Sequence, residues 1–182
     1  MVIIEEGFTD SLNRVNFIFM NESVTTECIK DYNGFTLLGQ RFGPFEQGKK
    51  YKLKLFSALP FIKNDILEIA PSEKCDNIDV QRYAMSERDD QKLNQTNDAY
   101  FLNRIREFRQ FMIEDIEKKQ KPQISLDRYN SYASSIIDNR LLKILKLTKS
   151  DLSMDDERRL TSAEKLLYRT LSNLIKKWRG FF

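Results

Sequence analysis

Histidine is absent from the sequence, which removes the commonest general base and the commonest zinc ligand of proteins. Glycine is scarce, with six residues among 182, and the chain has neither a GxxxxGK[ST] nor a GxGxxG phosphate-binding motif. No serine, threonine or cysteine stands beside a plausible base that would activate it as a nucleophile. We therefore expect a protein that is not an enzyme and that holds no cofactor and no metal.

Cysteine and long apolar runs are also rare. Cys28 and Cys75 lie far apart without the spacing of metal ligands, which is typical of a reduced, intracellular protein. No apolar run approaches the roughly 20 residues that a membrane-spanning helix needs, so we expect no membrane contact. The opening residues, MVIIEEGFTD, lack a basic segment followed by a long apolar one and do not read as a signal peptide.

The residues that are present have the composition of a folded soluble chain, with 41% hydrophobic and 31% charged residues. The formal net charge of +3 permits weak contact with nucleic acid without indicating it. An acidic cluster over residues 155–157 could hold a divalent cation, but it lacks the spacing and the glycine of a calcium-binding loop. We interpret it as a solvated cluster of charges.

The first part of the chain has the patterns of short strands separated by turn signals such as Asn33-Gly34 and Gly43-Pro44. Pro60 suits the first turn of a following helix, Ile69 is expected to begin a last short strand, and Pro71 closes the segment. We therefore expect a small β-rich domain over residues 1–71. The strands are predicted at 12–20, 23–30, 34–39 and 49–57.

The rest of the chain has a helical period. Residues 72–97 are polar and are predicted to be a linker with a short helix around 80–85, and residues 148–159 are predicted to be a loop. The helices are predicted at 98–119, capped by Asp98 and ended by Pro122, at 125–147, and at 161–182, opened by a capping box of Thr161 and Glu164.

The predicted class is thus α+β: a small β-rich domain, then a helical bundle over residues 98–182. The pattern of the middle helix leaves open whether Ile136 or Ile137, and Arg140 or Leu141, face the core.

Two of these helices have more apolar residues than one face can hold. Phe111, Met112 and Ile113 are consecutive, and consecutive helical residues point about 100° apart. The last helix ends in aromatic residues. Either the helices are enclosed in a bundle, or they share a face with another subunit. On the second reading, the candidate interface residues are Phe101, Ile105, Phe108, Phe111, Met112, Ile116, Leu171, Leu174, Trp178, Phe181 and Phe182.

Three stretches in this order resemble subunits of the GINS replication complex. They are GPFEQGKKYKLKLFSALPFIKNDILEI (43–69), SSIIDNRLLKILKL (134–147) and LTSAEKLLYRTLSNLIKKWR (160–179). Arg140 and Lys143 match the family's Arg-x-x-Lys-Ile pattern, whereas Phe61 stands where the family more often has Trp. The domain order resembles the archaeal class with an N-terminal β domain, which is related to the eukaryotic partner-of-Sld-five subunits.

This resemblance implies a non-catalytic scaffold. GINS subunits form a heterotetramer, often two copies each of two paralogous subunits, through their helical domains. The complex joins the MCM helicase to a Cdc45/RecJ-like protein at the replication fork, and a contact with primase or a weak contact with DNA is compatible with this role. The implied location is cytoplasmic in an archaeon and nuclear in a eukaryote. The candidate interface residues would then lie in the tetramer interface.

Two other interpretations remain. Lys49, Lys50, Lys52 and Lys54, with Tyr51 and Phe56 interleaved and with Arg179 in the basic last helix, could contact nucleic acid. Lysines on an edge strand also prevent aggregation, and basic residues are expected at the end of a helix. The final IKKWRGFF resembles a sliding-clamp-binding peptide in its aromatic pair, but Ile175 replaces the expected glutamine.

Overall fold

The computed structural model describes residues 2–37, 39–96 and 98–182. The chain divides into a unit of Asn16–Lys74, with a small sheet, and a helical unit of Met1–Val15 with Cys75–Phe182. The α+β class with a helical C-terminal region is therefore confirmed. Met1, Leu38 and Asn97, which bound or interrupt predicted segments, lie outside the described residues.

The predicted strand at 12–20 is wrong, because helix α1 extends over Val2–Met20. Phe17, which the alternating pattern assigns to a buried face, is 70% exposed, while Phe19 is 2% exposed. Phe8, Leu12, Val15 and Phe19 recur at helical spacing and are all at least partly buried. The helical period therefore describes this segment better than the strand period does.

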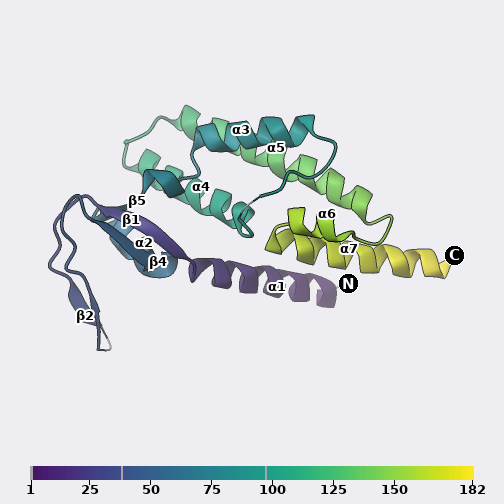
Figure 1. Cartoon of the computed structure of the whole chain (residues 1–182), viewed down its shortest axis with the longest axis horizontal. Coiled ribbons are helices and arrows are strands. Elements are labelled where there is room, and N and C mark those ends of the chain that lie inside the picture. Colours follow the sequence, from purple (N-terminus) through teal and green to yellow (C-terminus); the bar gives the residue numbers. More distant parts are fainter. Residues whose placement is uncertain (1, 38, 97) are drawn as a thin grey trace. The chain divides into compact units, whose positions relative to one another are not determined.

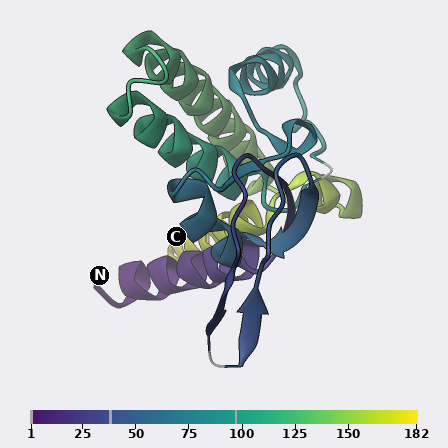
Figure 2. The same ribbon diagram turned by 90° about the vertical axis from the view of Figure 1, so that its left-hand side faces the viewer.

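The sheet unit contains a three-stranded antiparallel sheet in the order β4-β1-β5. A separate two-stranded ribbon extends away from this sheet (Figure 2). The core on one face of the sheet is formed by Cys28, Phe45, Phe61 and Leu67. The strands are β1 (Ser23–Cys28), β2 (Phe35–Leu37), β3 (Gln40–Phe42), β4 (Lys50–Lys54) and β5 (Leu67–Ile69).

Helix α2 (Leu55–Lys63) follows β4 without a loop and is followed by β5 and a short 3₁₀ helix (Pro71–Glu73). Pro60 lies inside α2 rather than in its first turn, which corrects the prediction. The helix begins earlier than expected because Leu55 and Ala58 are already buried, so packing rather than the proline determines its start.

The segment predicted as a linker with a short helix around 80–85 contains a longer helix, α3 (Asn77–Asp89), which packs along α5 (Figure 1). Asp76 caps it by accepting hydrogen bonds from the backbone N–H groups of Ile78 and Asp79. Val80, Ala84 and Glu87 form its buried face. The polar composition of this segment suggested a linker. Its buried polar residue, Glu87, instead forms ion pairs inside the helical unit.

Helices α4 (Phe101–Glu117) and α5 (Gln123–Leu147) pack against each other. Tyr100, rather than Asp98, is the N-cap of α4, although the Asp98 carboxylate accepts from the Tyr100 N–H at 2.8 Å. Pro122 is the N-cap of α5 rather than the end of α4.

The segment predicted as the loop 148–159 contains a short helix, α6 (Met154–Arg159), capped by the Ser153 hydroxyl. Helix α7 (Ser162–Phe181) opens with the predicted capping box of Thr161 and Glu164. Its buried positions are Glu164, Tyr168 and Ser172, and none of them is among the candidate interface residues.

Candidate functional site

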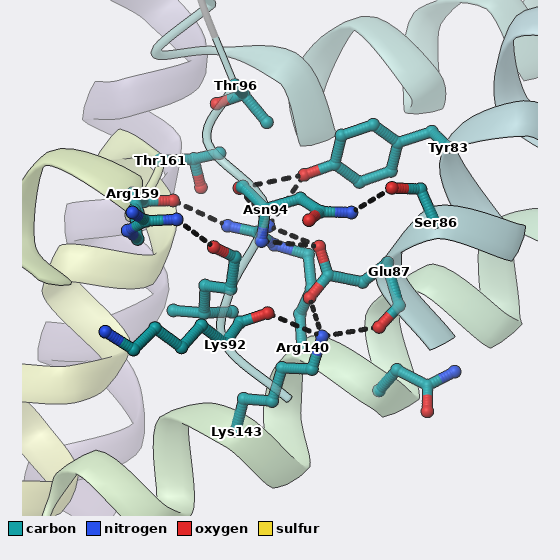
Figure 3. Close-up of polar contacts among 12 residues, drawn as sticks. Tyr83, Ser86, Glu87, Lys92, Asn94, Thr96, Arg140, Lys143, Arg159 and Thr161 are labelled. Atoms are coloured by element: carbon teal, nitrogen blue, oxygen red, sulfur yellow. Dashed lines mark hydrogen bonds and ion pairs between the residues drawn. The ribbon is translucent and has the colours of Figure 1, made fainter. Parts of the chain in front are cut away.

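Four charged side chains meet in the interior of the helical unit: Glu87, Arg140, Lys143 and Glu164. Figure 3 shows Glu87, Arg140 and Lys143 with the polar groups around them. They come from α3, α5 and α7, and Lys143, the most exposed of the four, is only 9% exposed. We call them the buried ion cluster. Two carboxylates balance two cations, which is the condition under which buried charges are tolerated.

Arg140 is the centre of the cluster. Its Nε and Nη2 donate to the two carboxylate oxygens of Glu164 at 2.6 and 2.7 Å, and its Nη1 donates to Glu87 Oε2 at 2.9 Å. Lys143 Nζ donates to Glu87 Oε1 at 2.6 Å and also to the backbone carbonyl of Glu87. The bidentate Arg140–Glu164 pair is the strongest hydrogen-bonding arrangement that these groups offer.

Three cationic side chains also hold the segment between α3 and α4. Lys143 donates to the carbonyl of Lys92 at 2.9 Å, Arg159 to that of Leu93 at 3.0 Å, and Arg140 to that of Asn94 at 3.1 Å (Figure 3). Three consecutive backbone carbonyls of an irregular segment are thus satisfied by side chains. The Leu93 side chain, 2% exposed, packs beneath with Ile144 and Leu160.

The electrostatic setting of Arg140 favours its charged form. Burial disfavours the charge of Arg140, but the hydrogen bonds and the charge of Glu164 outweigh burial, and the pKa of the guanidinium is raised. Burial also raises the pKa of Tyr83, whose hydroxyl accepts from Arg140 Nη1 at 2.7 Å. The guanidinium of Arg140 and the hydroxyl of Tyr83 thus form part of a buried junction between α5 and α3.

Only part of this cluster is visible in the sequence. Arg140 and Lys143 belong to the Arg-x-x-Lys-Ile pattern, and Glu164 belongs to the predicted capping box. In that box the Glu164 carboxylate also accepts from the Thr161 N–H at 2.8 Å. Glu87 was missed because it lies in the predicted linker. Its spacing from Val80 and Ala84 is the signal that could have placed it on a buried helical face.

The candidate interface residues of α4 belong largely to the chain's own core. Ile105 and Met112 are 3% and 6% exposed, so they are not available to a second subunit, which corrects their assignment. Phe101, Phe108 and Ile116 pack against the same core, which α3 and α5 complete. Phe111 is half-buried, with its ring 5.6 Å from that of Phe108. The wide stripe of α4 is therefore explained by an enclosed position.

The last turns of α7 are different. Leu171 packs against the core formed around Leu93 and Ile144, but Leu174 is 57% exposed. Trp178, Phe181 and Phe182 are 63%, 83% and 87% exposed, and the ring of Phe182 contacts those of Trp178 and Phe181 edge to face at 5.4 and 5.1 Å. We call Leu174, Trp178, Phe181 and Phe182 the α7 aromatic face. It is the part of the predicted interface that the chain leaves uncovered.

Helix α5 exposes a second apolar strip that sequence reasoning did not select. Ile136 and Arg140 face the core, so Ile137 and Leu141 face outward, which settles the question that the pattern left open. The burial of Arg140 in the ion cluster determines this rotation, because its carboxylate partners lie inside. The exposed residues of the strip are Ile137, Leu141, Leu142 and Leu145.

The basic residues of the nucleic-acid interpretation are placed as follows. Lys49 pairs with Glu46 at 2.6 Å, whereas Lys50, Lys52 and Lys54 are exposed on β4. Tyr51 does not lie beside these lysines, because its ring packs edge to face on Phe45 at 4.9 Å in the core. Phe56 is half-exposed on α2, and Arg179, exposed on α7, donates to the carbonyl of Lys149 at 3.4 Å.

In the described part of the chain, no three Cys, Asp or Glu side chains gather as metal ligands would. None of its helices combines the length and the apolarity needed to cross a membrane. A scan against models of known protein families and a search of the curated proteins each found no match. The functional inference therefore depends on the geometry of this chain and on the patterns in its sequence.

Proposed function

We propose that this protein is a non-catalytic scaffold subunit of a GINS-type complex in DNA replication. In this role it would assemble with a paralogous subunit and help to link the MCM helicase to a RecJ-like or Cdc45-like partner. The observation that carries the proposal is the α7 aromatic face, since the other half of the predicted interface is used inside the chain.

The size of this face supports a partner. An aromatic side chain presents about 150–250 Å², so Trp178, Phe181 and Phe182 at their exposed fractions present together about 350–600 Å². A stable interface buries about 800 Å² on each partner and is anchored by aromatic residues. The α7 aromatic face would supply about half of that area, and Leu174 and residues around it would supply more.

The buried ion cluster supports the resemblance on which the proposal also rests. In the Arg-x-x-Lys-Ile segment, Arg140, Lys143 and Ile144 are 1%, 9% and 1% exposed. All three residues of the pattern therefore have a role inside the helical unit. A rigid junction of α3, α5 and α7 suits a scaffold, because it holds the α7 aromatic face in one orientation for a partner.

The test is light scattering after size exclusion, on this chain alone and on the chain co-expressed with a candidate paralogous subunit. A mass of four chains with both subunits present is the expected result. A folded monomer that ignores the partner would overturn the proposal. Trp178→Ala should weaken the assembly, and Ile78→Ala is a matched control, since Ile78 is 62% exposed elsewhere in the helical unit.

The nucleic-acid alternative predicts a different result. A binding module would bind single-stranded DNA at moderate salt and lose affinity steeply as salt rises. Stacking of bases needs aromatic rings beside the cations, and Tyr51 lies in the core instead. We therefore rank this alternative second, and a salt titration of DNA binding by the chain alone distinguishes it from the scaffold.

A further inference from the structure

Strand β4 lies at one edge of the three-stranded sheet, and its hydrogen-bonding direction can be read from its pairing with β1. The Leu55 N–H donates to the Glu22 carbonyl at 2.9 Å, and the Cys28 N–H donates to the Lys49 carbonyl at 2.9 Å. In an antiparallel pair, alternate residues turn their backbone groups toward the partner strand. Tyr51 and Leu53 therefore bond to β1, while Lys50 and Lys52 turn their N–H and C=O groups outward. Lys54 turns its N–H outward, and its C=O belongs to the start of α2, of which Lys54 is the N-cap.

The outer edge of β4 is thus open to a further strand. Among the described residues, no backbone hydrogen bond at this outer edge joins Lys50 or Lys52 to another segment. An unpaired row of donors and acceptors on an exposed strand is a template for pairing with another chain. The strand is five residues long, its outward groups come from alternate residues, and all of it lies inside the sheet unit.

The two faces of β4 differ in chemistry. Lys50, Lys52 and Lys54 share the solvent face, where Lys50 lies opposite Glu27 on β1, Lys52 opposite Thr25 and Lys54 opposite Ser23. Glu27 offsets part of the charge of Lys50. Lys52 and Lys54 have neutral residues opposite them on β1, and their ammonium groups form no ion pair with a described residue. Two uncompensated positive charges therefore lie at alternate positions along the edge.

On the other face, Tyr51 and Leu53 pack against the core of the sheet unit and are only half-buried. A strand added at the edge would place its alternate side chains about 4.5–5.5 Å from theirs. Apolar side chains at those positions would extend the core, and acidic side chains at the intervening positions would lie beside the lysines. The edge therefore specifies an alternating acidic and apolar partner.

We propose that the outer edge of β4 binds an extended, acidic segment of a partner protein, which adds to the sheet as a further strand. The carboxylates of the segment lie beside Lys52 and Lys54, and its apolar side chains lie beside Tyr51 and Leu53. Backbone hydrogen bonds supply affinity and the alternate side chains supply specificity, as in other cases of strand addition. This goes beyond the scaffold role, which depends on the α7 aromatic face in the helical unit.

Two other roles for the lysines are weaker on the same geometry. Nucleic acid would need exposed aromatic rings among the cations. The ring of Tyr51 faces the core, and the half-exposed Phe56 lies on α2, beyond the strand. Protection against aggregation explains the charges without any partner. It does not require the half-buried Tyr51 and Leu53 at the same edge, which leave room for apolar side chains.

The experiment measures binding of a labelled short peptide of alternating glutamate and valine to the full chain by fluorescence anisotropy. Two further versions of the peptide have methyl groups on one or the other alternate set of backbone nitrogens. Strand addition predicts that one methylated version loses binding about tenfold or more, because its methyl groups face β4, while the other binds as the parent does. Equal binding of both versions would show attraction of charge alone and would overturn the proposal.

Variants of the chain test the same edge from the other side. Lys52→Pro removes an outward N–H and leaves the bonds to β1 in place, so it should abolish binding with little loss of fold. Lys52→Glu with Lys54→Glu should reject the acidic peptide and accept a lysine–valine peptide. Lys49→Ala is the matched control, because Lys49 precedes β4 and is paired with Glu46, and it should bind normally. Thermal unfolding of each variant checks that the sheet unit is intact.

Three further results would overturn the proposal. The first is no binding of the acidic peptide at low salt. The second is competition by a thymidine oligonucleotide that binds more tightly, which would assign the edge to nucleic acid. The third is self-association of a Lys52→Thr, Lys54→Thr variant while the original chain binds no peptide, which would leave the lysines a protective role only. None of these results bears on assembly through the α7 aromatic face.

Discussion

The first and last turns of α7 reverse the usual distribution of residues. The first turns bury Glu164 and Ser172, which are 3% and 7% exposed, and the last turns expose Trp178 and Phe181. Glu164 is buried because Arg140 and the Thr161 N–H occupy its oxygens. Among the described aromatic side chains, those at the end of α7 have ring contacts only within their own group. Burial in this helix follows the available partners rather than residue type.

This contrast separates two kinds of role along one helix. The buried end fixes α7 to α3 and α5 through ion pairs that tolerate little change. The exposed end contributes little to the fold of its own unit, so its apolar area remains available for binding. Variants at the two ends should therefore affect stability and assembly separately.

The largest effect is expected from Arg140→Ala. This change leaves Glu87 and Glu164 buried with one cation fewer, and breaking a buried pair in this way lowers the free energy of unfolding by about 3–5 kcal/mol. Urea denaturation of the chain measures the loss. Arg128→Ala, at an exposed position of the same helix, should change stability by less than about 0.5 kcal/mol. Equal losses of stability in the two variants would contradict the special role of the buried arginine.

A pH titration tests a residue that is buried without charge. Burial raises the pKa of the Cys75 thiol from 9.0 to about 11. The folded thiol keeps its proton to a higher pH than the unfolded thiol. Its contribution to the free energy of unfolding is therefore fully present below pH 9 and is lost as pH rises toward 11. The loss amounts to about 2–3 kcal/mol.

The check is the free energy of unfolding of the original chain and of Cys75→Ala at pH 8 and near pH 10.5. The variant should lose less stability between the two values. Some loss should remain in both proteins, because burial also raises the pKa values of Tyr83 and Tyr129. Identical slopes would mean that the thiol does not contribute.

At the exposed end, Trp178→Ala should leave the isolated chain almost as stable as before, within about 0.5 kcal/mol. If the scaffold proposal holds, the same change should weaken binding to the partner subunit about 30-fold, or about 2 kcal/mol, because aromatic anchors dominate such interfaces. Sedimentation velocity and circular dichroism on the same samples measure assembly and helix content. Unchanged assembly would remove Trp178 from the interface.

The smallest effect is expected at the helix caps. Thr161→Ala removes the side-chain acceptor for the Glu164 N–H and should lower stability by about 1 kcal/mol. Ser153→Ala removes the equivalent cap of α6, which has no buried residue, and should have a smaller effect. Thermal unfolding compares the two. A larger effect at Ser153 would indicate that α6 is more important to the fold than its exposure suggests.

The sequence predicted elements where the local pattern and the burial agree. The capping box of Thr161 and Glu164 and the strands at β1, β4 and β5 are examples, because short-range chemistry determines them. It failed at α1, where Val15, Phe17 and Phe19 fit the strand period although only Phe19 is deeply buried. The apolar residues of this segment fit both the strand period and the helical period, and only tertiary packing distinguishes the two.

The candidate site was harder to predict than the fold. A wide apolar stripe looks the same whether a chain's own helices or another subunit covers it. Ile105 and Trp178 were therefore grouped together, although their exposed fractions are 3% and 63%. The charged partner Glu87 was missed because a buried glutamate is recognisable only with its distant cations, Arg140 and Lys143. Such pairings lie beyond the range of local sequence patterns.

The three carbonyls between α3 and α4 have a consequence for proteolysis. A protease that cuts after lysine must reach the Lys92 carbonyl, and that oxygen is held by Lys143, itself 9% exposed. Nicking after Lys92 therefore requires this part of the helical unit to open. The rate of cleavage would therefore report the rate of that opening. It should rise in Arg140→Ala and stay unchanged when the α7 aromatic face is altered.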